Sequence, residues 1–137
     1  MAIYNLDTSI LLDIYEKRGR NGEYAKKLIL KIIEENSKII CSDLHITELK
    51  HLNYTLEEIN LIFQIAKPNN IIRTHTDKKQ KEEAVNVAFK LNIPKGDALH
   101  AIIARDNNAI MVSRDHDFEK LKQIVEVKKP EDLVKVL

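Results

Sequence analysis

Residues 98–112 read ALHAIIARDNNAIMV and contain two apolar segments of different character. The first segment, ALHAIIA at 98–104, is apolar nearly all round, which is typical of a helix packed on several sides. The second segment, AIMV at 109–112, is short and apolar at every position, as in a strand buried on both faces. A buried helix that leads into a buried strand indicates an α/β fold with a parallel sheet.

The same alternation extends along the chain in both directions. Residues 21–36 carry apolar side chains at helical spacing, and Thr55 opens a capping-box pattern ahead of another apolar helical face. Strands that are apolar throughout need cover on both faces, so we predict a three-layer α/β/α sandwich around a central, mostly parallel five-stranded sheet. The predicted strands are residues 2–6, 38–41, 71–74, 109–112 and, with a weaker pattern, 124–127.

The composition excludes several classes of protein. With 44% hydrophobic and 31% charged residues, three glycines and three prolines, the chain of 137 residues is neither disordered nor fibrous. We expect one domain over residues 1–137, with the short helices between 42 and 67 forming a protruding hairpin. The 22 Lys and Arg residues balance 21 Asp and Glu residues, so any binding of nucleic acid has to be local.

The cysteine content and the N-terminal residues bear on the cellular compartment. The one cysteine, Cys41, cannot form an internal disulfide, and the cysteine and histidine spacing of a structural zinc site is missing. Asp7 and Asp13 interrupt the first apolar run, which argues against a signal peptide or a membrane span. We expect a cytoplasmic protein in which Cys41 is a buried, unreactive thiol.

Three aspartates fall at or near the ends of predicted parallel strands. Asp7 directly follows the first strand, and Asp115 lies shortly after the AIMV strand. Asp97 lies in the first turn of the buried helix that precedes the AIMV strand. Glu48 comes from the helix after the predicted strand at 38–41, which reads KIIC. Because the functional crevice of an open parallel sheet lies beyond the carboxyl ends of its strands, we expect these four carboxylates to converge.

A group of four carboxylates repels itself unless protons, basic side chains or a cation neutralise it. Oxygen ligands without a cysteine or a histidine pair suit Mg²⁺ or Mn²⁺, which complete their coordination with water and substrate phosphate. The sequence therefore predicts metal-dependent chemistry on phosphodiesters.

Four motifs in this order resemble those of the PIN-domain ribonucleases, and among them the VapC-type toxins of toxin–antitoxin modules. The motifs cover nearly the whole chain and are Leu6-Asp7-Thr8-Ser9, Thr47-Glu48-Leu49, Gly96-Asp97-Ala98-Leu99-His100-Ala101 and Val112-Ser113-Arg114-Asp115-His116-Asp117-Phe118. The resemblance implies a PIN-like fold and an endoribonuclease that also binds a small cognate antitoxin and forms a homodimer. It implies that Mg²⁺ or Mn²⁺ is held by Asp7, Glu48, Asp97 and Asp115, with Asp117 as a second candidate in the last motif.

Side chains beside these acids are further candidates for the site. Ser9 and Ser113 are expected to orient a carboxylate or to bind phosphate, although the family more often has Thr where this chain has Ser113. Arg114 and His100 are candidates for substrate contact. Lys95 and Arg105 flank the same motifs and are candidates for contact with the RNA backbone.

Each candidate also has an ordinary structural interpretation. Asp7 and Asp97 are good helix N-caps, and Glu48 has Lys50 and Lys81 as possible surface ion-pair partners. A histidine in a buried helix, such as His100, is usually a core residue. Asp13 is interpreted as solvated or ion-paired, and the surface interpretation applies to His45, His51, His75 and His116.

Two other function classes stay open. One is a different Mg²⁺-dependent α/β phosphotransfer domain, such as a receiver or a phosphatase, but Asp7 is followed by Thr8 and Ser9 and not by the second acid that such sites need. The other is a catalytically idle PIN-like module that acts only by binding a partner. The presence of an acid at all four positions favours the nuclease, while the kind of RNA that it cleaves is open.

Overall fold

The computed structural model describes residues 2–134, and a five-stranded sheet lies at their centre. All four pairs of neighbouring strands are parallel, which confirms the predicted α/β fold. The order is β3-β2-β1-β4-β5, so the first strand of the chain is the central one. The strands are β1 (Ile3–Leu6), β2 (Lys38–Ser42), β3 (Ile71–Thr74), β4 (Ile110–Val112) and β5 (Val127–Lys128).

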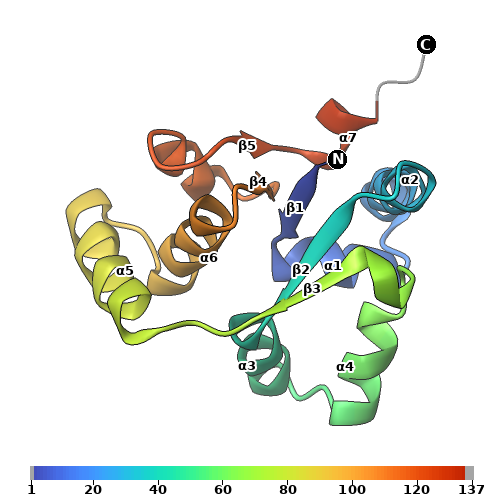
Figure 1. Ribbon diagram of the computed structural model, residues 1–137, viewed down its shortest axis with the longest axis horizontal. Helices are drawn as coiled ribbons and strands as arrows, with labels where there is room; N and C mark the ends of the chain where they lie inside the picture. The colour runs from blue at the N-terminus through green and yellow to red at the C-terminus, as the bar shows by residue number, and fades with distance from the viewer. Residues whose placement is uncertain (1, 135–137) are drawn as a thin grey trace.

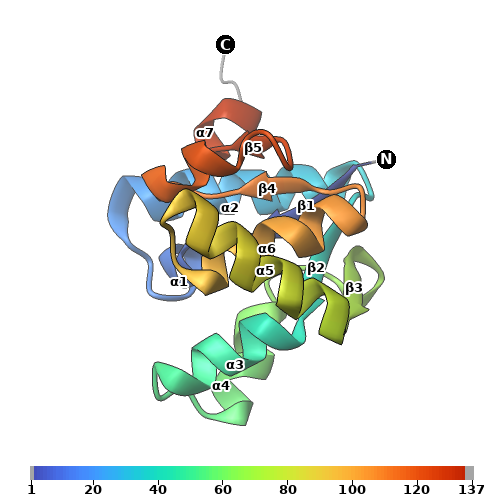
Figure 2. The ribbon, with the colours of Figure 1, turned by 90° about the vertical axis from the view of Figure 1, so that its left-hand side faces the viewer.

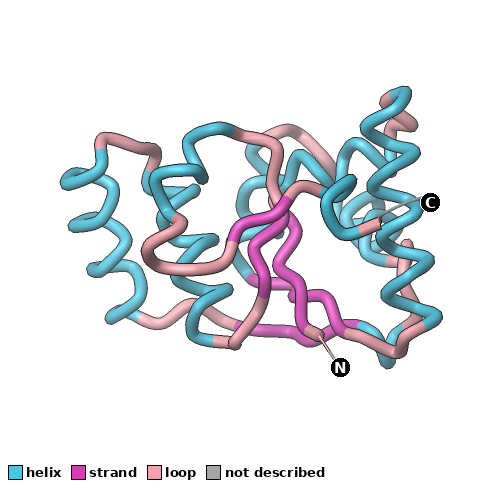
Figure 3. Tube along the Cα trace, turned by 90° about the horizontal axis from the view of Figure 1, so that it is seen from above, coloured by secondary structure: helices cyan, strands magenta, loops and turns pink. Residues whose placement is uncertain are grey.

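Helices cover both faces of this sheet. Figure 1 shows α5 and α6 on one side of the strands and α2 on the other, and Figure 3 shows the strands between the two groups of helices. Within residues 2–134, no helix combines the length and the apolar character that crossing a bilayer requires. The helices are α1 (Thr8–Tyr15), α2 (Gly19–Glu34), α3 (Asp43–His51), α4 (Leu56–Phe63), α5 (Lys78–Leu91), α6 (Lys95–Asp106) and α7 (Pro130–Leu133), with short 3-10 helices at Pro68–Asn70 and His116–Leu121.

Successive strand residues face two separate hydrophobic cores. Ile39 of β2 packs with Leu6 in the core on the side of α1 and α2. The next residue, Ile40, packs with Met111 in the core on the side of α5 and α6. Because both faces of β1, β2 and β4 are buried, these strands have mainly apolar runs instead of an alternating pattern.

The predicted pair of short helices after β2 lies at one end of the molecule (Figures 1 and 2). Ser42 ends β2 and also caps α3, because its hydroxyl accepts a hydrogen bond from the His45 backbone N–H at 3.2 Å. Thr55 caps α4 in the same way, through the backbone N–H of Glu58. Because Ser42 is both the last residue of β2 and the cap of α3, this helix begins directly at the end of the strand.

Some predicted bounds differ from the structure. The last strand is shorter and later than the predicted run at 124–127, because Ile124 closes a turn through its N–H to the carbonyl of Leu121. The predicted buried thiol is confirmed: Cys41 is free and buried in β2, and this burial raises the pKa of its thiol above the usual value of 9.0.

Candidate metal centre

The carboxyl ends of β1 and β4 are joined directly. The backbone N–H of Asp7 donates a hydrogen bond of 2.9 Å to the carbonyl of Val112, the last residue of β4. The acids that follow these two strands therefore begin from the same edge of the sheet, as predicted from the strand ends.

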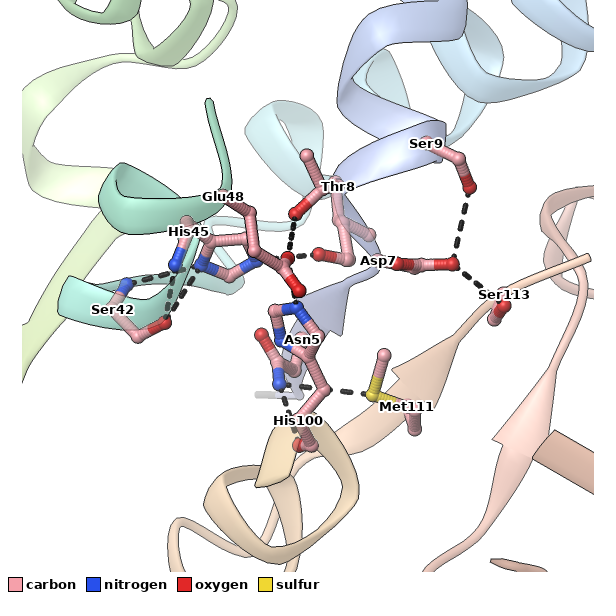
Figure 4. Close-up of polar contacts among 11 residues, drawn as sticks. Asn5, Asp7, Thr8, Ser9, Ser42, His45, Glu48, His100, Met111 and Ser113 are labelled. Carbon is pink, nitrogen blue, oxygen red and sulfur yellow. Dashed lines mark hydrogen bonds and ion pairs between the residues drawn. The ribbon is translucent and has the colours of Figure 1, made fainter. Parts of the chain in front are cut away.

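Ser113 links the two strand-end acids through its side chain. Its hydroxyl donates to Asp7 Oδ2 at 3.0 Å and accepts from the backbone N–H of Asp115 at 3.0 Å. The hydroxyl of Ser9 also donates to Asp7 Oδ2, at 3.1 Å (Figure 4). Asp7 stands at the N-cap position of α1, but its side chain makes no cap bond. Its carboxylate is therefore oriented by two side-chain hydroxyls and not by the backbone N–H groups of the helix.

Three aspartates form a group that we call the acid cluster: Asp97, Asp115 and Asp117. Each offers a carboxylate oxygen, and the three oxygens lie within 4.8 Å of one another. The backbone N–H of Asp117 donates to Asp115 Oδ1 at 3.0 Å, which holds these two residues in a tight turn. Asp115 is exposed and the other two are half-buried. The structure thus brings both candidate acids of the last motif to Asp97.

Asp97 is the most perturbed acid of the cluster. It lies in the first turn of α6, where Pro94 occupies the N-cap position, so its carboxylate is not used as a cap. Its Oδ2 atom is buried and has no hydrogen-bond partner among residues 2–134. Burial, followed by the negative charges of Asp7 and Asp115, raises the pKa of Asp97 from 3.8 to about 7.

These features fit a hard divalent cation. The donors of the acid cluster are all carboxylate oxygens, which Mg²⁺ and Mn²⁺ prefer. A buried oxygen without a partner and a carboxyl group that holds its proton to about pH 7 both indicate uncompensated negative charge. A cation bound between the three aspartates would compensate that charge.

Glu48 lies apart from the acid cluster and has its own donors. Its Oε1 atom accepts a hydrogen bond from the Thr8 hydroxyl at 2.6 Å and lies 2.7 Å from Nε2 of His100 (Figure 4). Burial by itself would raise the pKa of Glu48, but the hydrogen bond and positive charge of His100, together with Thr8, lower it below 4.5. A surface ion pair with Lys50 or Lys81 was the alternative interpretation, and the structure shows the Thr8 and His100 contacts instead.

The surface interpretation of His45 is wrong, since this side chain is fully buried. The backbone N–H of Ser42 donates to its Nδ1 atom at 3.1 Å, so the proton of the neutral ring is on Nε2, which lies 2.6 Å from the carbonyl of Leu6. Burial and the neighbouring His100 lower the pKa of His45 to about 3, so the ring is neutral. The remaining three histidines, His51, His75 and His116, are exposed as predicted.

The two arginine candidates are engaged in ion pairs within the protein. Arg114 has only 19% of its side chain exposed and lies 2.7 Å from Glu131 and 3.8 Å from Asp13. Asp13 was predicted to be either solvated or ion-paired. It is buried and forms an ion pair with Arg18. Arg105 is at the far end of α6 from Asp97 and bonds Glu83 at 2.8 Å.

Sequence reasoning did not identify the residues that hold Glu48 and His100. A Cβ atom at Gly96 would lie 2.8 Å from Glu48 Oε2, so the glycine leaves room for that carboxylate. The side-chain amide of Asn5, fully buried in β1, donates to the carbonyl of His100 at 2.9 Å. A polar residue inside an apolar strand is the signal that points to Asn5.

Comparison with known proteins gives one family and several similar structures. The family model of the PIN domain matches residues 4–124. The structure of VapBC2 from Rickettsia felis, bound to a DNA fragment from its promoter, has a chain that is 20% identical, with a TM-score of 0.67 over 93% of this chain and 98% of that one. A chain of VapBC-1 from nontypeable Haemophilus influenzae is 17% identical, with a TM-score of 0.65 over 93% of this chain and 98% of that one.

A toxin–antitoxin complex from Klebsiella pneumoniae is similar to the same degree, with 17% identity and a TM-score of 0.64 over 95% of this chain and 98% of that chain. No curated protein sequence matches the chain. At these identities, the likeness to solved structures concerns the fold.

Proposed function

The chain belongs to the PIN-domain family, whose members are nucleases, and we propose that it is a metal-dependent endoribonuclease. The observation that supports this most is the acid cluster, in which three carboxylate oxygens lie within 4.8 Å beside Asp7. We take residues 1–137 as one nuclease domain, since the PIN model spans 4–124 and includes all of the candidate acids.

In this proposal, Asp97, Asp115 and Asp117 hold Mg²⁺ or Mn²⁺ together with Asp7 and Glu48. Such a cation, when bound, polarises the scissile phosphate and lowers the pKa of a coordinated water. Asp97 contributes the buried oxygen that has no hydrogen-bond partner within the described part of the chain.

The chain's other residues keep the acids in place. Ser9 and Ser113 orient Asp7 through its Oδ2 atom, which leaves Oδ1 free of both hydroxyl bonds. The Ser113 hydroxyl also fixes the backbone at Asp115. Lys95 is exposed at the start of α6, two residues before Asp97, and we propose that it contacts a phosphate of the RNA backbone.

We also propose that the protein is the toxin of a toxin–antitoxin pair, that a small cognate antitoxin is its partner and that it forms a homodimer. The support is the similarity in fold to chains of VapBC and other toxin–antitoxin complexes over more than nine-tenths of this chain. A cytoplasmic location follows from an RNA substrate and is part of the same proposal.

The test is cleavage of a mixed RNA pool by the purified protein with Mg²⁺ or Mn²⁺, with EDTA in a parallel reaction. We expect cleavage with metal, none with EDTA, and none by a variant that carries both Asp7→Asn and Asp97→Asn. Asp106→Asn is the matched control, because Asp106 is an exposed acid at the other end of α6 that bonds Arg105 and Gln80. Equal cleavage by the double variant and the wild type would contradict the proposal.

If neither protein cleaves RNA after any bound inhibitor has been removed, the alternative of an idle binding module takes its place. Cleavage that persists in EDTA would instead separate the nuclease activity from the acid cluster.

A further inference from the structure

One face of α6 encloses the carboxylate of Glu48. Gly96 and His100 are four residues apart on this helix, so they lie one above the other on the same face. Nε2 of His100 lies 2.7 Å from Glu48 Oε1, and a Cβ atom at Gly96 would lie only 2.8 Å from Oε2. The helix therefore offers a hydrogen-bond donor to one oxygen and space to the other.

A second donor reaches the same oxygen from α1. The hydroxyl of Thr8 donates to Glu48 Oε1 at 2.6 Å, and neither this bond nor the one from His100 uses Oε2. Two donors from different helices on one oxygen restrict the rotation of the carboxylate about its last bond. Oε2 is then held beside Gly96, the residue directly before Asp97 of the acid cluster.

His100 is itself held by its surroundings. Its side chain is fully buried, and its carbonyl accepts a hydrogen bond from the Asn5 amide at 2.9 Å. Its ring centroid lies 4.8 Å from that of His45, which is bonded to Leu6 and Ser42. The backbone of His100 is tethered by Asn5 and its buried ring packs against His45, so the ring has little freedom and can act as a rigid support for Glu48.

We propose that His100 is a positioning residue of the metal centre, which acts by holding Glu48 so that Oε2 is presented to the cation. The inference rests on the proposed function, and it replaces direct substrate contact as the role of His100. Substrate cannot reach a fully buried ring, whereas the ring reaches Glu48 at hydrogen-bond distance. Thr8 and Gly96 take part in the same arrangement, one as a donor and the other by its lack of a side chain.

The experiment measures Mn²⁺ binding to the full chain by isothermal titration calorimetry, so that it does not depend on RNA cleavage. Outer-shell partners of metal ligands typically change metal affinity by 10–100-fold, and we expect His100→Leu to weaken Mn²⁺ binding by about tenfold. His100→Gln keeps a donor nitrogen at a similar reach and is expected to retain affinity within about threefold of the wild type.

Two further comparisons separate positioning from general damage to the fold. In a Glu48→Ala background, His100→Leu is expected to have no further effect on Mn²⁺ affinity, because the side chain that His100 holds has been removed. Ile103→Val is the control for a loosened helix, since Ile103 is fully buried in α6 but belongs to the hydrophobic core. It is expected to lower thermal stability and to leave the Mn²⁺ affinity unchanged.

Gly96→Ala provides a variant that does not remove a buried hydrogen bond. The new methyl group would push Oε2 of Glu48 from its place, so we expect Mn²⁺ binding about tenfold weaker. Alanine is the better helix former, so thermal stability is not expected to fall with the affinity.

The inference is overturned if His100→Leu binds Mn²⁺ like the wild type, or if it weakens binding equally with and without Glu48. In both cases the wild type still binds Mn²⁺, so the proposed function stands. A wild-type protein that binds no Mn²⁺ would overturn the metal centre and this inference together.

Discussion

Glu48 and Asp97 are both half-buried acids of the proposed metal centre, but their negative charges are compensated in different ways. Oε1 of Glu48 receives hydrogen bonds from Thr8 and His100, and its pKa is lowered. Oδ2 of Asp97 is buried and has no hydrogen-bond partner in residues 2–134, and the pKa of Asp97 is raised to about 7. Burial disfavours both charges, so the difference comes from the neighbours, which are donors and a positive charge at Glu48 but negative charges at Asp97. The charge of Glu48 is thus compensated by protein donors, while the charge of Asp97 calls for a proton or a cation.

The largest effect is expected from Asp97→Asn. We predict that it lowers RNA cleavage by at least about 100-fold, because even indirect changes around a metal cost 10–100-fold. The thermal midpoint in EDTA is expected to stay level or rise, since the amide removes one of several repelling charges. Steady-state kinetics and thermal unfolding of the same preparations provide the two measurements. A midpoint that falls along with activity would mean that Asp97 is needed for folding.

Removal of metal should make stability depend on pH through Asp97. The folded pKa of about 7 lies above the ordinary value of 3.8, so between these values the folded state holds more protons than the unfolded state. Metal-free stability is therefore greatest at the acidic end and declines as the pH rises from about 4 to about 7. The control is Asp97→Asn, in which this part of the slope should be lost.

Mn²⁺ should reverse that decline. Binding to the folded state alone adds about 2.7 kcal/mol at a free concentration 100-fold above Kd. The stabilisation by Mn²⁺ should be larger at about pH 8 than at about pH 5, because a carboxylate must lose its proton to bind the cation. The stabilisation is measured by thermal unfolding at each pH. Equal stabilisation at both pH values would mean that Mn²⁺ binds away from Asp97.

A moderate effect is expected at Ser113, which connects Asp7 to the acid cluster. Ser113→Ala removes the hydroxyl that bonds Asp7 Oδ2 and the N–H of Asp115 and should lower kcat by about tenfold. Ser113→Thr keeps the hydroxyl and should stay near the wild type. If alanine and threonine variants have the same kcat, the hydroxyl does not orient Asp7.

The smallest effect is expected at Arg105, which lies outside the proposed metal centre. Its ion pairs with Glu83 and Asp106 are on the surface, and such pairs contribute about 0–1 kcal/mol. Arg105→Gln should change the free energy of unfolding by less than about 1 kcal/mol. RNA cleavage should be unchanged, and a clear rise in KM for RNA would instead restore Arg105 as a contact to the RNA backbone.

The contrast between Glu48 and Asp97 also marks what the sequence can predict. Asp7 and Asp115 are predictable as neighbours because apolar runs show where β1 and β4 end, and parallel strands end at one edge. The donors of Glu48 are not predictable in this way, because Thr8 and His100 are 40 and 52 positions away. Such contacts depend on how α1, α3 and α6 pack, which periodicity does not specify.

The burial of His45 shows the same limit. Its helix α3 has few apolar residues, so its pattern says little about which polar side chain turns inward. The ring is buried because Ser42 and the carbonyl of Leu6 supply partners for both of its nitrogens. Asp13 is likewise buried because Arg18 and Arg114 approach it from other segments. At each position one partner is distant in the sequence, Leu6 for His45 and Arg114 for Asp13, so local propensity alone does not determine the burial.

The hydrogen bond between Ser113 and Asp7 also has a consequence in time. These residues are 106 positions apart, so a ribosome that adds about 5–20 residues per second takes roughly 5–20 s to proceed from one to the other. Throughout that interval the central strand β1 lacks its neighbour β4, and Asp7 lacks its partners at the strand end. The nascent chain therefore acquires the link between Asp7 and the acid cluster only after residues 113–117 have been synthesised.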